Sequence, residues 1–266
     1  MHLCYFVLIS TLLVACQNDT HHKEIMALPH EPDTQILLDQ PKPITPAPYP
    51  WQDAERSTIR PITKEYFRCR GSSLNPPRIV LDGTKELQRY FDCSGGEKHS
   101  LPLYEGKEHV YPILIELVNE IQKKTNSPVI ITSGHRCPTH QTYIDSSPKA
   151  TGSKHQVGAA VSFYVQGFEA HLERIVQIIF DYYKTNELYK DKKEYITFCR
   201  YEKESDVTTN PWYNKEVFIK LYKKEEGRDF DNRHPYPYLN VQVRHDRDKN
   251  EPITVSFAKA NQLLRK

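Results

Sequence analysis

One segment in the middle of the chain, residues 133–163, constrains the fold most strongly. It follows a short apolar run at 129–132, which we expect to be a buried strand that delivers residues 133–136 into a loop. A polar loop at 138–154 comes next. After Gly158, residues 159–165 alternate as a strand does, so that Ser162 faces the same side as Ala160 while Val161 and Phe163 face the other.

The residues of this segment match a zinc-enzyme signature. The matching positions are Ser133, Gly134, Arg136, Ser153, His155, Gly158 and Ala160. Their spacing resembles the zinc D-alanyl-D-alanine carboxypeptidase and dipeptidase family, which carries Ser-Gly-x-Arg and then Ser-x-His-x-x-Gly-x-Ala-x-Asp. The resemblance covers residues 108–244 and implies an α+β domain of the DD-peptidase or hedgehog type, with helices packed on a mostly antiparallel sheet.

Three positions of the implied zinc site carry different chemistry. Ser162 stands where the family has its aspartate. On a late strand, Asn240 stands in place of the family's histidine and Pro237 in place of its catalytic glutamate. Neutral oxygen ligands bind zinc far more weakly than imidazole or carboxylate. The resemblance therefore leaves His155 as the metal ligand of a degenerate site, with zinc as cofactor only if that site functions.

Several alternatives remain open for the residues around the motif. The resemblance implies that Arg136 holds substrate or stabilises negative charge, whereas the alternative is an arginine that braces the loop. Ser133 and Ser153, the other expected substrate-binding positions, are otherwise turn residues, and His155 is otherwise a hydrogen-bonded loop histidine. Replacement ligands for zinc, unless they are simply solvated, would be His135, His140, His234, His245, Asp246 and Asp248.

The N-terminal region predicts export. An apolar run at 2–15 has the length of a signal-peptide core and ends in Leu13-Val14-Ala15-Cys16, which resembles a bacterial lipobox. We expect a signal peptide at 1–15, a lipid on Cys16 that attaches the chain to the membrane, and a proline-rich tether at 16–60. By analogy, Gln17 favours the outer membrane of the cell envelope. The alternative is an ordinary signal peptide with a chance cysteine.

Four cysteines remain beyond the tether: Cys69, Cys93, Cys137 and Cys199. An even number in an exported chain predicts two disulfides, with three possible pairings. We favour Cys69 with Cys93, which close a local loop, and Cys137 with Cys199, which would tie the motif loop to a later strand. A four-cysteine zinc site is disfavoured because no close Cys-x-x-Cys pair occurs. A nucleophilic Cys137 is disfavoured because an exported thiol with a partner is expected to be oxidised.

The rest of the chain predicts one domain, at 105–266, behind a loop-rich cap subregion at 61–104. Apolar residues at steps of three and four predict helices over 108–124 and 169–189. We expect strands at 194–201, 216–222 and 238–244, a further strand from 253 and a short helix at 258–264. The formal charge of +2, with acids and bases interspersed, argues against a nucleic-acid partner.

Two functions follow from the resemblance. In the first, the domain is a pseudoenzyme that binds peptidoglycan peptides, or an envelope protein, through the former active-site cleft. In the second, it is a metallopeptidase that trims D-alanine from murein peptides, with His155 and non-standard ligands holding a metal-bound water. The three changed positions favour the first.

Overall fold

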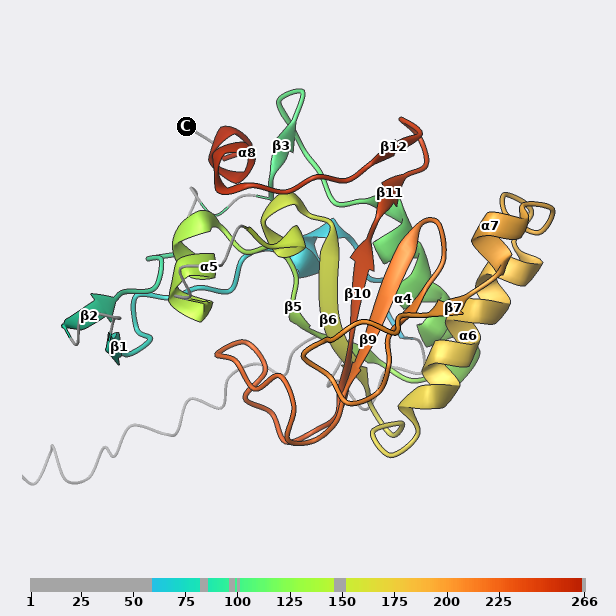
Figure 1. The fold of residues 1–266 in the computed structure, drawn as a ribbon, viewed down its shortest axis with the longest axis horizontal. Coiled ribbons are helices and arrows are strands. Elements are labelled where there is room, and N and C mark those ends of the chain that lie inside the picture. The colour runs from blue at the N-terminus through green and yellow to red at the C-terminus, as the bar shows by residue number, and fades with distance from the viewer. Residues whose placement is uncertain (1–58, 82–85, 96–98, 100, 146–151, 265–266) are drawn as a thin grey trace, which may run out of the picture. The chain divides into compact units, whose positions relative to one another are not determined.

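A six-stranded antiparallel sheet organises the chain (Figure 1). The computed structural model describes residues 59–81, 86–95, 99, 101–145 and 152–264. The strand order is β5-β6-β10-β9-β8-β7, and each neighbouring pair is antiparallel. The strands are β5 (Val129–Ser133), β6 (Ala160–Val165), β7 (Cys199–Arg200), β8 (Trp212–Tyr213), β9 (Val217–Tyr222) and β10 (Tyr238–Val243).

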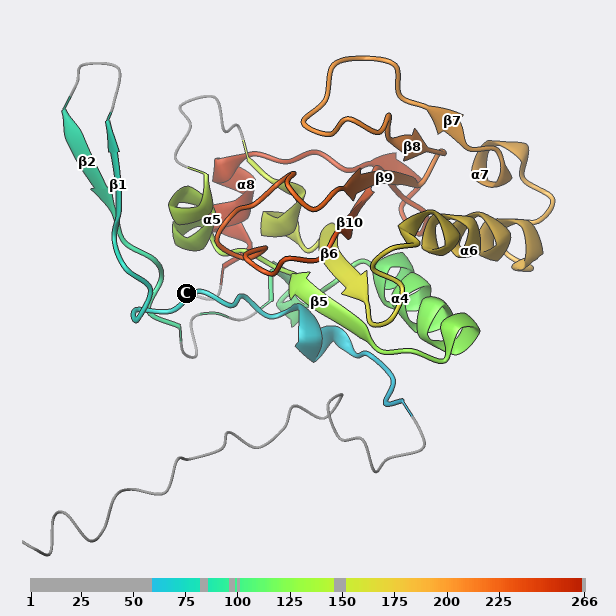
Figure 2. The ribbon, with the colours of Figure 1, turned by 90° about the horizontal axis from the view of Figure 1, so that it is seen from below.

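Two helices cover one side of this sheet. They are α4 (Pro112–Thr125) and α6 (Leu172–Thr185), which contact each other, and in both Figure 1 and Figure 2 they lie on one side of the strands. The other side carries α5 (Pro138–Ile144) and α8 (Phe257–Gln262), which also touch each other. Helices on a mostly antiparallel sheet make the α+β class that the sequence predicts.

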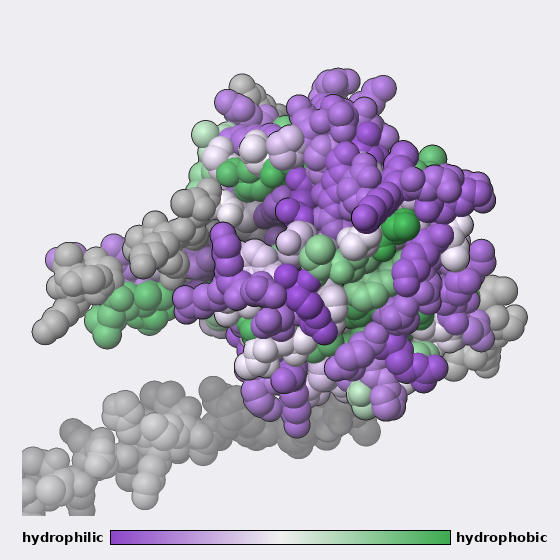
Figure 3. All heavy atoms as spheres, turned by 45° about the vertical axis from the view of Figure 1, so that its right-hand side comes forward, coloured by the Kyte–Doolittle hydropathy of each residue, from purple (hydrophilic) through white to green (hydrophobic). Residues whose placement is uncertain are grey.

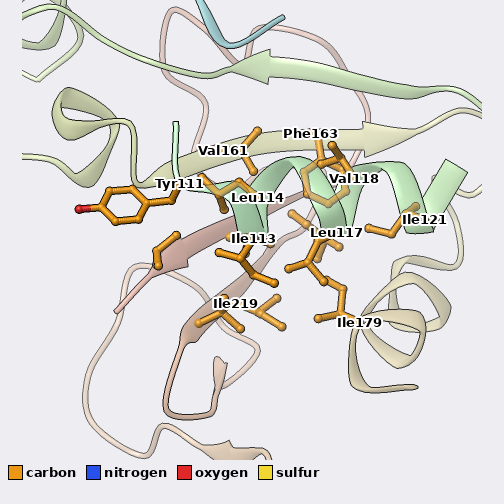
Figure 4. Packing of buried hydrophobic residues seen from close by; sticks show 14 of the residues in the cluster. Tyr111, Ile113, Leu114, Leu117, Val118, Ile121, Val161, Phe163, Ile179 and Ile219 are labelled. Atoms are coloured by element: carbon orange, nitrogen blue, oxygen red, sulfur yellow. The ribbon is translucent and has the colours of Figure 1, made fainter. Parts of the chain in front are cut away.

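The core lies between the sheet and the two long helices (Figure 4). Leu114 and Leu117 of α4 and Ile179 of α6 are buried against Phe163 of β6 and Ile219 of β9. Burying one such side chain contributes roughly 1.5–3 kcal/mol, so this stripe supplies much of the domain's stability. The alternation predicted for β6 is confirmed, because its apolar side chains enter the core while Ser162 faces away from it into a cleft.

The helix predictions are confirmed with shorter bounds. The first helix begins at Pro112, in the N-terminal turn where proline is tolerated, and ends at Asn126, whose left-handed φ of 49° stops it. The preceding residues instead form β4 (Lys107–Glu108), which pairs with β3 (Leu103–Tyr104). The predicted C-terminal helix is α8, one residue earlier than expected.

Two strand predictions are corrected. Residues 194–201 form α7 (Lys193–Ile196) followed by the two-residue β7, because loop residues bind the carbonyls that a strand would offer: Lys215 N donates to Glu194 O and Asn214 Nδ2 to Tyr195 O. The strand expected from 253 is instead β12 (Glu251–Pro252), which pairs with β11 (His245–Asp246) outside the main sheet.

The segment expected to be a cap packs into the same core. Ile62 and Leu101 are buried there, and so is Phe67 of the short helix η1 (Lys64–Phe67). Within the described part of this segment, the hairpin of β1 (Arg78–Leu81) and β2 (Leu87–Tyr90) projects from the body in Figures 1 and 2, with Leu81 and Leu87 exposed. The face drawn in Figure 3 is otherwise mostly hydrophilic.

The expected signal peptide, the lipidated Cys16 and the tether up to residue 58 lie outside the described residues. Within the described part of the chain, no helix has the length and apolar character needed to cross a membrane.

Candidate functional site

A cleft of about 710 Å³ opens on the side of the sheet opposite the two long helices. Ser162 of β6 and Asn240 and Gln242 of β10 line it, together with His155 of the short helix η3 (Lys154–Val157) and Arg136 of the loop after β5. The motif residues from distant parts of the chain therefore meet in one cavity, of a size typical of ligand-binding sites.

The three metal-ligand positions of the implied zinc site, His155, Ser162 and Asn240, lie together. Ser162 and Asn240 are direct partners in the β6–β10 pairing. Asn240 Nδ2 donates to Ser162 Oγ at 2.9 Å and lies 3.1 Å from His155 Nε2. The β6–β10 register thus brings Asn240 beside Ser162 and His155, and its correspondence to the family histidine stays a prediction.

His155 is held as a neutral imidazole. Its Nδ1 donates to Gly134 O at 2.6 Å, which leaves Nε2 as the acceptor for the Asn240 amide. Gln242 Nε2 donates to Asn240 Oδ1 at 2.8 Å, which fixes the orientation of that amide. Burial and then the positive charge of Arg136 lower the pKa of His155 to about 3, so the ring stays uncharged at neutral pH.

This set of donor atoms does not fit zinc. The one imidazole lone pair accepts an amide N–H, and the other two groups are a neutral hydroxyl and a neutral amide. None of the described histidines, cysteines or acids forms a three-ligand group with His155. The proposed replacement ligands His234, His245 and Asp246 therefore do not complete a metal site there.

Arg136 lies in a buried ion network with two acids of the β9–β10 connection. Its Nε donates to Ser133 Oγ and Asp231 Oδ2, and its Nη2 to Asp229 Oδ2, each at 2.8 Å. Burial opposes ionisation of Asp231, but the charge of Arg136 and hydrogen bonds from His140 and Ser133 outweigh it and hold the pKa of Asp231 well below its usual range. Arg136 thus braces the loop while it also lines the cleft.

His140 extends this network away from the cleft. Its Nε2 lies 2.9 Å from Asp231 Oδ1 and its Nδ1 lies 2.6 Å from Asp92 Oδ1. Both partners are carboxylates, so both ring nitrogens donate and the ring is an imidazolium. Burial would lower the pKa of His140, but the two acids and Cys69 raise it to about 9.

Other residues of the signature stabilise the local backbone conformation. Ser153 and Gln156 form a capping box at the start of η3, as the turn interpretation of Ser153 predicts. A Cβ on Gly134 would lie 2.5 Å from Phe67 Cα and O, so the passage of η1 requires glycine there. Gly158 caps η3 with a left-handed φ of 68°.

Neither expected disulfide is formed in the structure. Cys69 Sγ and Cys93 Sγ are 3.9 Å apart, and the cysteines at 69, 93, 137 and 199 are all free. Cys137 follows β5 and Cys199 lies on β7, which are the two opposite edges of the sheet, so this pair cannot meet. Cys137 instead lies beside Cys69 and Cys93.

A group of four side chains that could hold a metal ion results from this arrangement. The ligand atoms of Cys69, Cys93, His99 and Cys137 all lie within 4.8 Å of one another. The pKa of Cys137 is lowered, because its sulfur accepts hydrogen bonds from the Cys69 and Cys93 thiols and from backbone N–H groups at the start of α5. We call this group the thiol cluster.

The sequence motifs do not reveal Asp229, Asp231 and Asp92, although these acids set the charge of the site. The signal available in the sequence was the pair of basic residues Arg136 and His140 in the segment after a buried strand, since buried cations need anionic partners.

Comparison of the chain with protein-family models, with curated proteins and with solved structures finds no match in any of the three. The peptidase resemblance accordingly stays a prediction based on the motif residues.

Proposed function

We propose that the domain is a non-catalytic binding module of the cell envelope, which holds peptidoglycan peptides in the cleft beside Arg136 and His155. The single observation behind this proposal is the hydrogen-bonded set of His155, Asn240 and Ser162 on the cleft surface. In this set Asn240 and Ser162 stand where the resemblance implies a histidine and an aspartate, and the groups present are neutral and satisfy one another, while the cavity remains open to a ligand.

Hydrolysis would need a metal-bound water or another activated nucleophile, and a base to deprotonate it. Two of the three acids that line the cleft already have cationic partners: Asp229 accepts from Arg136, and Asp206 accepts from Lys220 at 2.5 Å. The third, Asp145, is exposed. Pro237 occupies the family glutamate's place and has no ionisable group. These positions favour binding over cleavage.

The cleft offers groups that suit a peptide ending in a carboxylate. Arg136 Nη1 has no hydrogen-bond partner among the described residues, so it can donate to an anionic ligand. The Gln242 side chain offers amide chemistry to peptide groups. Tyr222 and Tyr238 stack on each other with ring centroids 4.6 Å apart and line the same cavity, where they offer apolar contact area.

The expected lipid on Cys16 fits this proposal. A lipid anchor followed by a proline-rich tether would hold the domain near the murein layer, with the outer membrane as the favoured location.

Calorimetric titration of the full chain with muropeptides ending in D-Ala-D-Ala tests the proposal. We expect binding that weakens by roughly tenfold in Gln242→Ala, which removes one polar contact of about 1.4 kcal/mol. The matched control is Gln177→Ala, which removes an exposed glutamine on α6, and it should bind as the parent does. Peptides amidated at the C-terminus should bind more weakly because Arg136 Nη1 would lose an anionic acceptor.

A parallel assay for released D-alanine, with zinc added, separates the two functions. We expect no release. Release that disappears in His155→Ala would overturn the non-catalytic proposal and establish a peptidase, and absence of muropeptide binding would overturn the ligand class.

A further inference from the structure

The thiol cluster brings together four chain segments. Cys69 follows η1, Cys93 follows β2, His99 precedes β3, and Cys137 is the N-cap residue of α5. The first two cysteines therefore flank the β1–β2 hairpin at its base. Cys93 and Cys137 are buried, and Cys69 is half-buried. Such a concentration of sulfur ligands inside a fold needs a chemical reason.

The distances fit a tetrahedral metal better than a disulfide. Zinc lies about 2.3 Å from a thiolate sulfur, so two sulfurs at corners of the tetrahedron are roughly 3.8 Å apart. The Cys69 and Cys93 sulfurs are 3.9 Å apart. A disulfide would require about 2.05 Å. Three sulfurs and one imidazole nitrogen also make a complete zinc ligand set of a type found in structural sites.

His99 supplies an independent observation. Its Nδ1 is buried and has no hydrogen-bond partner among the described residues. A buried polar atom without a partner costs about 1–3 kcal/mol in desolvation. Coordination of a metal beside the three sulfurs would remove this penalty, because the ring would then use its lone pair.

We propose that Cys69, Cys93, His99 and Cys137 bind one zinc ion in a structural site. Soft thiolate ligands select zinc over the hard cations magnesium and calcium. Four protein ligands close the coordination sphere, so no position remains for a reactive water and the ion has a structural role. It would fasten the hairpin base to the loop that carries Arg136. This site is separate from the peptidase-like cleft and does not depend on the proposed function.

Hydrogen bonds around the cluster support this role. His140 N donates to Cys137 Sγ at 3.3 Å, which is the kind of outer contact that stabilises a ligating thiolate. Asp92, next to Cys93, accepts from Cys93 N and from the His140 ring, and His140 in turn binds Asp231 beside Arg136. Zinc at the cluster would thus hold one wall of the cleft in place through a continuous buried network.

The first experiment measures metals in the full chain, purified without chelator or added thiol, by mass spectrometry of the elements. We expect one zinc per chain. Cys137→Ser and Cys93→Ser should lower the zinc content at least roughly tenfold, since each removes a thiolate. The matched control Cys199→Ser removes the exposed thiol on β7 and should retain zinc. His99→Ala should release zinc to a chelator faster than the parent, and His135→Ala, which removes a neighbouring buried imidazole, should not.

A second measurement avoids the risk that cysteine variants fail to fold. Cobalt replaces zinc in the unmodified chain, and tetrahedral thiolate coordination then gives intense visible absorption bands together with sulfur-to-cobalt charge transfer. We expect both. Chelation of zinc from the parent chain should also lower the unfolding temperature.

Three outcomes would overturn the site. One is a metal-free chain whose native mass is lower by two hydrogens than that of the reduced chain, because Cys69 and Cys93 form a disulfide. The second is zinc that survives Cys137→Ser but is lost in His155→Ala, which would move the metal to the peptidase-like cleft. The third is a cobalt complex without sulfur-to-cobalt bands.

Discussion

The His155 site and the thiol cluster lie at two ends of one buried network. They differ in whether their possible metal-donor atoms have hydrogen-bond partners. At His155 an imidazole, an amide and a hydroxyl satisfy one another. At the thiol cluster three sulfurs crowd together and a ring nitrogen has no partner among the described residues. The comparison teaches that metal binding is better judged from which donors remain unsatisfied than from which signature they belong to.

The largest expected effect converts the first region into the second. Ser162→Asp with Asn240→His restores a carboxylate and an imidazole beside His155. Because Ser162 and Asn240 are paired across β6 and β10, the three ligands should meet, and zinc affinity at this position should rise on the order of a thousandfold. Zinc content per chain should increase by one over the parent, and His155→Ala should remove the added ion. No increase would mean that the alignment of Asn240 with the family histidine is wrong.

Next in size is the network that joins the two regions. Asp231→Asn removes the carboxylate that both Arg136 and His140 need, so two buried cations lose a partner. We expect the free energy of unfolding to fall by about 3–5 kcal/mol, measured by urea denaturation. Asp191→Asn, at an exposed acid, is the control and should change it by about 0.5 kcal/mol or less. Equal effects of the two variants would contradict the network.

A third prediction concerns the neutral state of His155. Its folded pKa of about 3 lies below the usual value of 6.5, so the unfolded chain binds a proton that the folded chain refuses. Stability is therefore present above pH 6.5 and is lost as the pH falls, by roughly 2 kcal/mol at pH 5. Between pH 7.5 and pH 5, the free energy of unfolding of the parent should fall by roughly 2 kcal/mol more than that of His155→Gln. A His155 ring that titrates near 6.5 by NMR would contradict it.

The smallest effect concerns Ser153. Ser153 caps η3. Ser153→Ala should therefore lower the free energy of unfolding by about 1 kcal/mol, and Ser153→Thr should retain most of the parent's stability. Ser153 borders the cleft, but its hydroxyl already accepts the N–H of His155, so muropeptide affinity should stay unchanged in both variants. A loss of affinity with unchanged stability would show that Ser153 touches the ligand instead.

Regular patterning made the fold readable from the sequence. The apolar stripe of 110–121 and the alternation of 159–165 predicted a helix and a strand, and they predicted which side chains enter the core, because periodicity reports burial directly. The strand prediction for 194–201 was wrong because the apolar pattern there is short. Contacts from Asn214 and Lys215, distant in sequence, decided the conformation.

The sequence predicted only some of the residues that form the site. Arg136 and His155 stand in a spaced signature, and the structure brings them together. The partners Asp229 and Asp231 come from a loop whose acids look solvated in sequence, and only the fold buries them against a cation. The cysteine pairing failed because spacing along the chain carries no information about which sheet edge a residue reaches.

The close contact between Gly134 and Phe67 has a consequence for how genomes are read. A glycine that packing alone requires will be retained by selection on folding even after catalysis has been lost, and the same holds for a helix cap such as Ser153. Half of a peptidase signature can thus persist for generations as architecture. Searches that score every letter of such a signature equally will count pseudoenzymes as enzymes, whereas weighting the ionisable positions would separate the two.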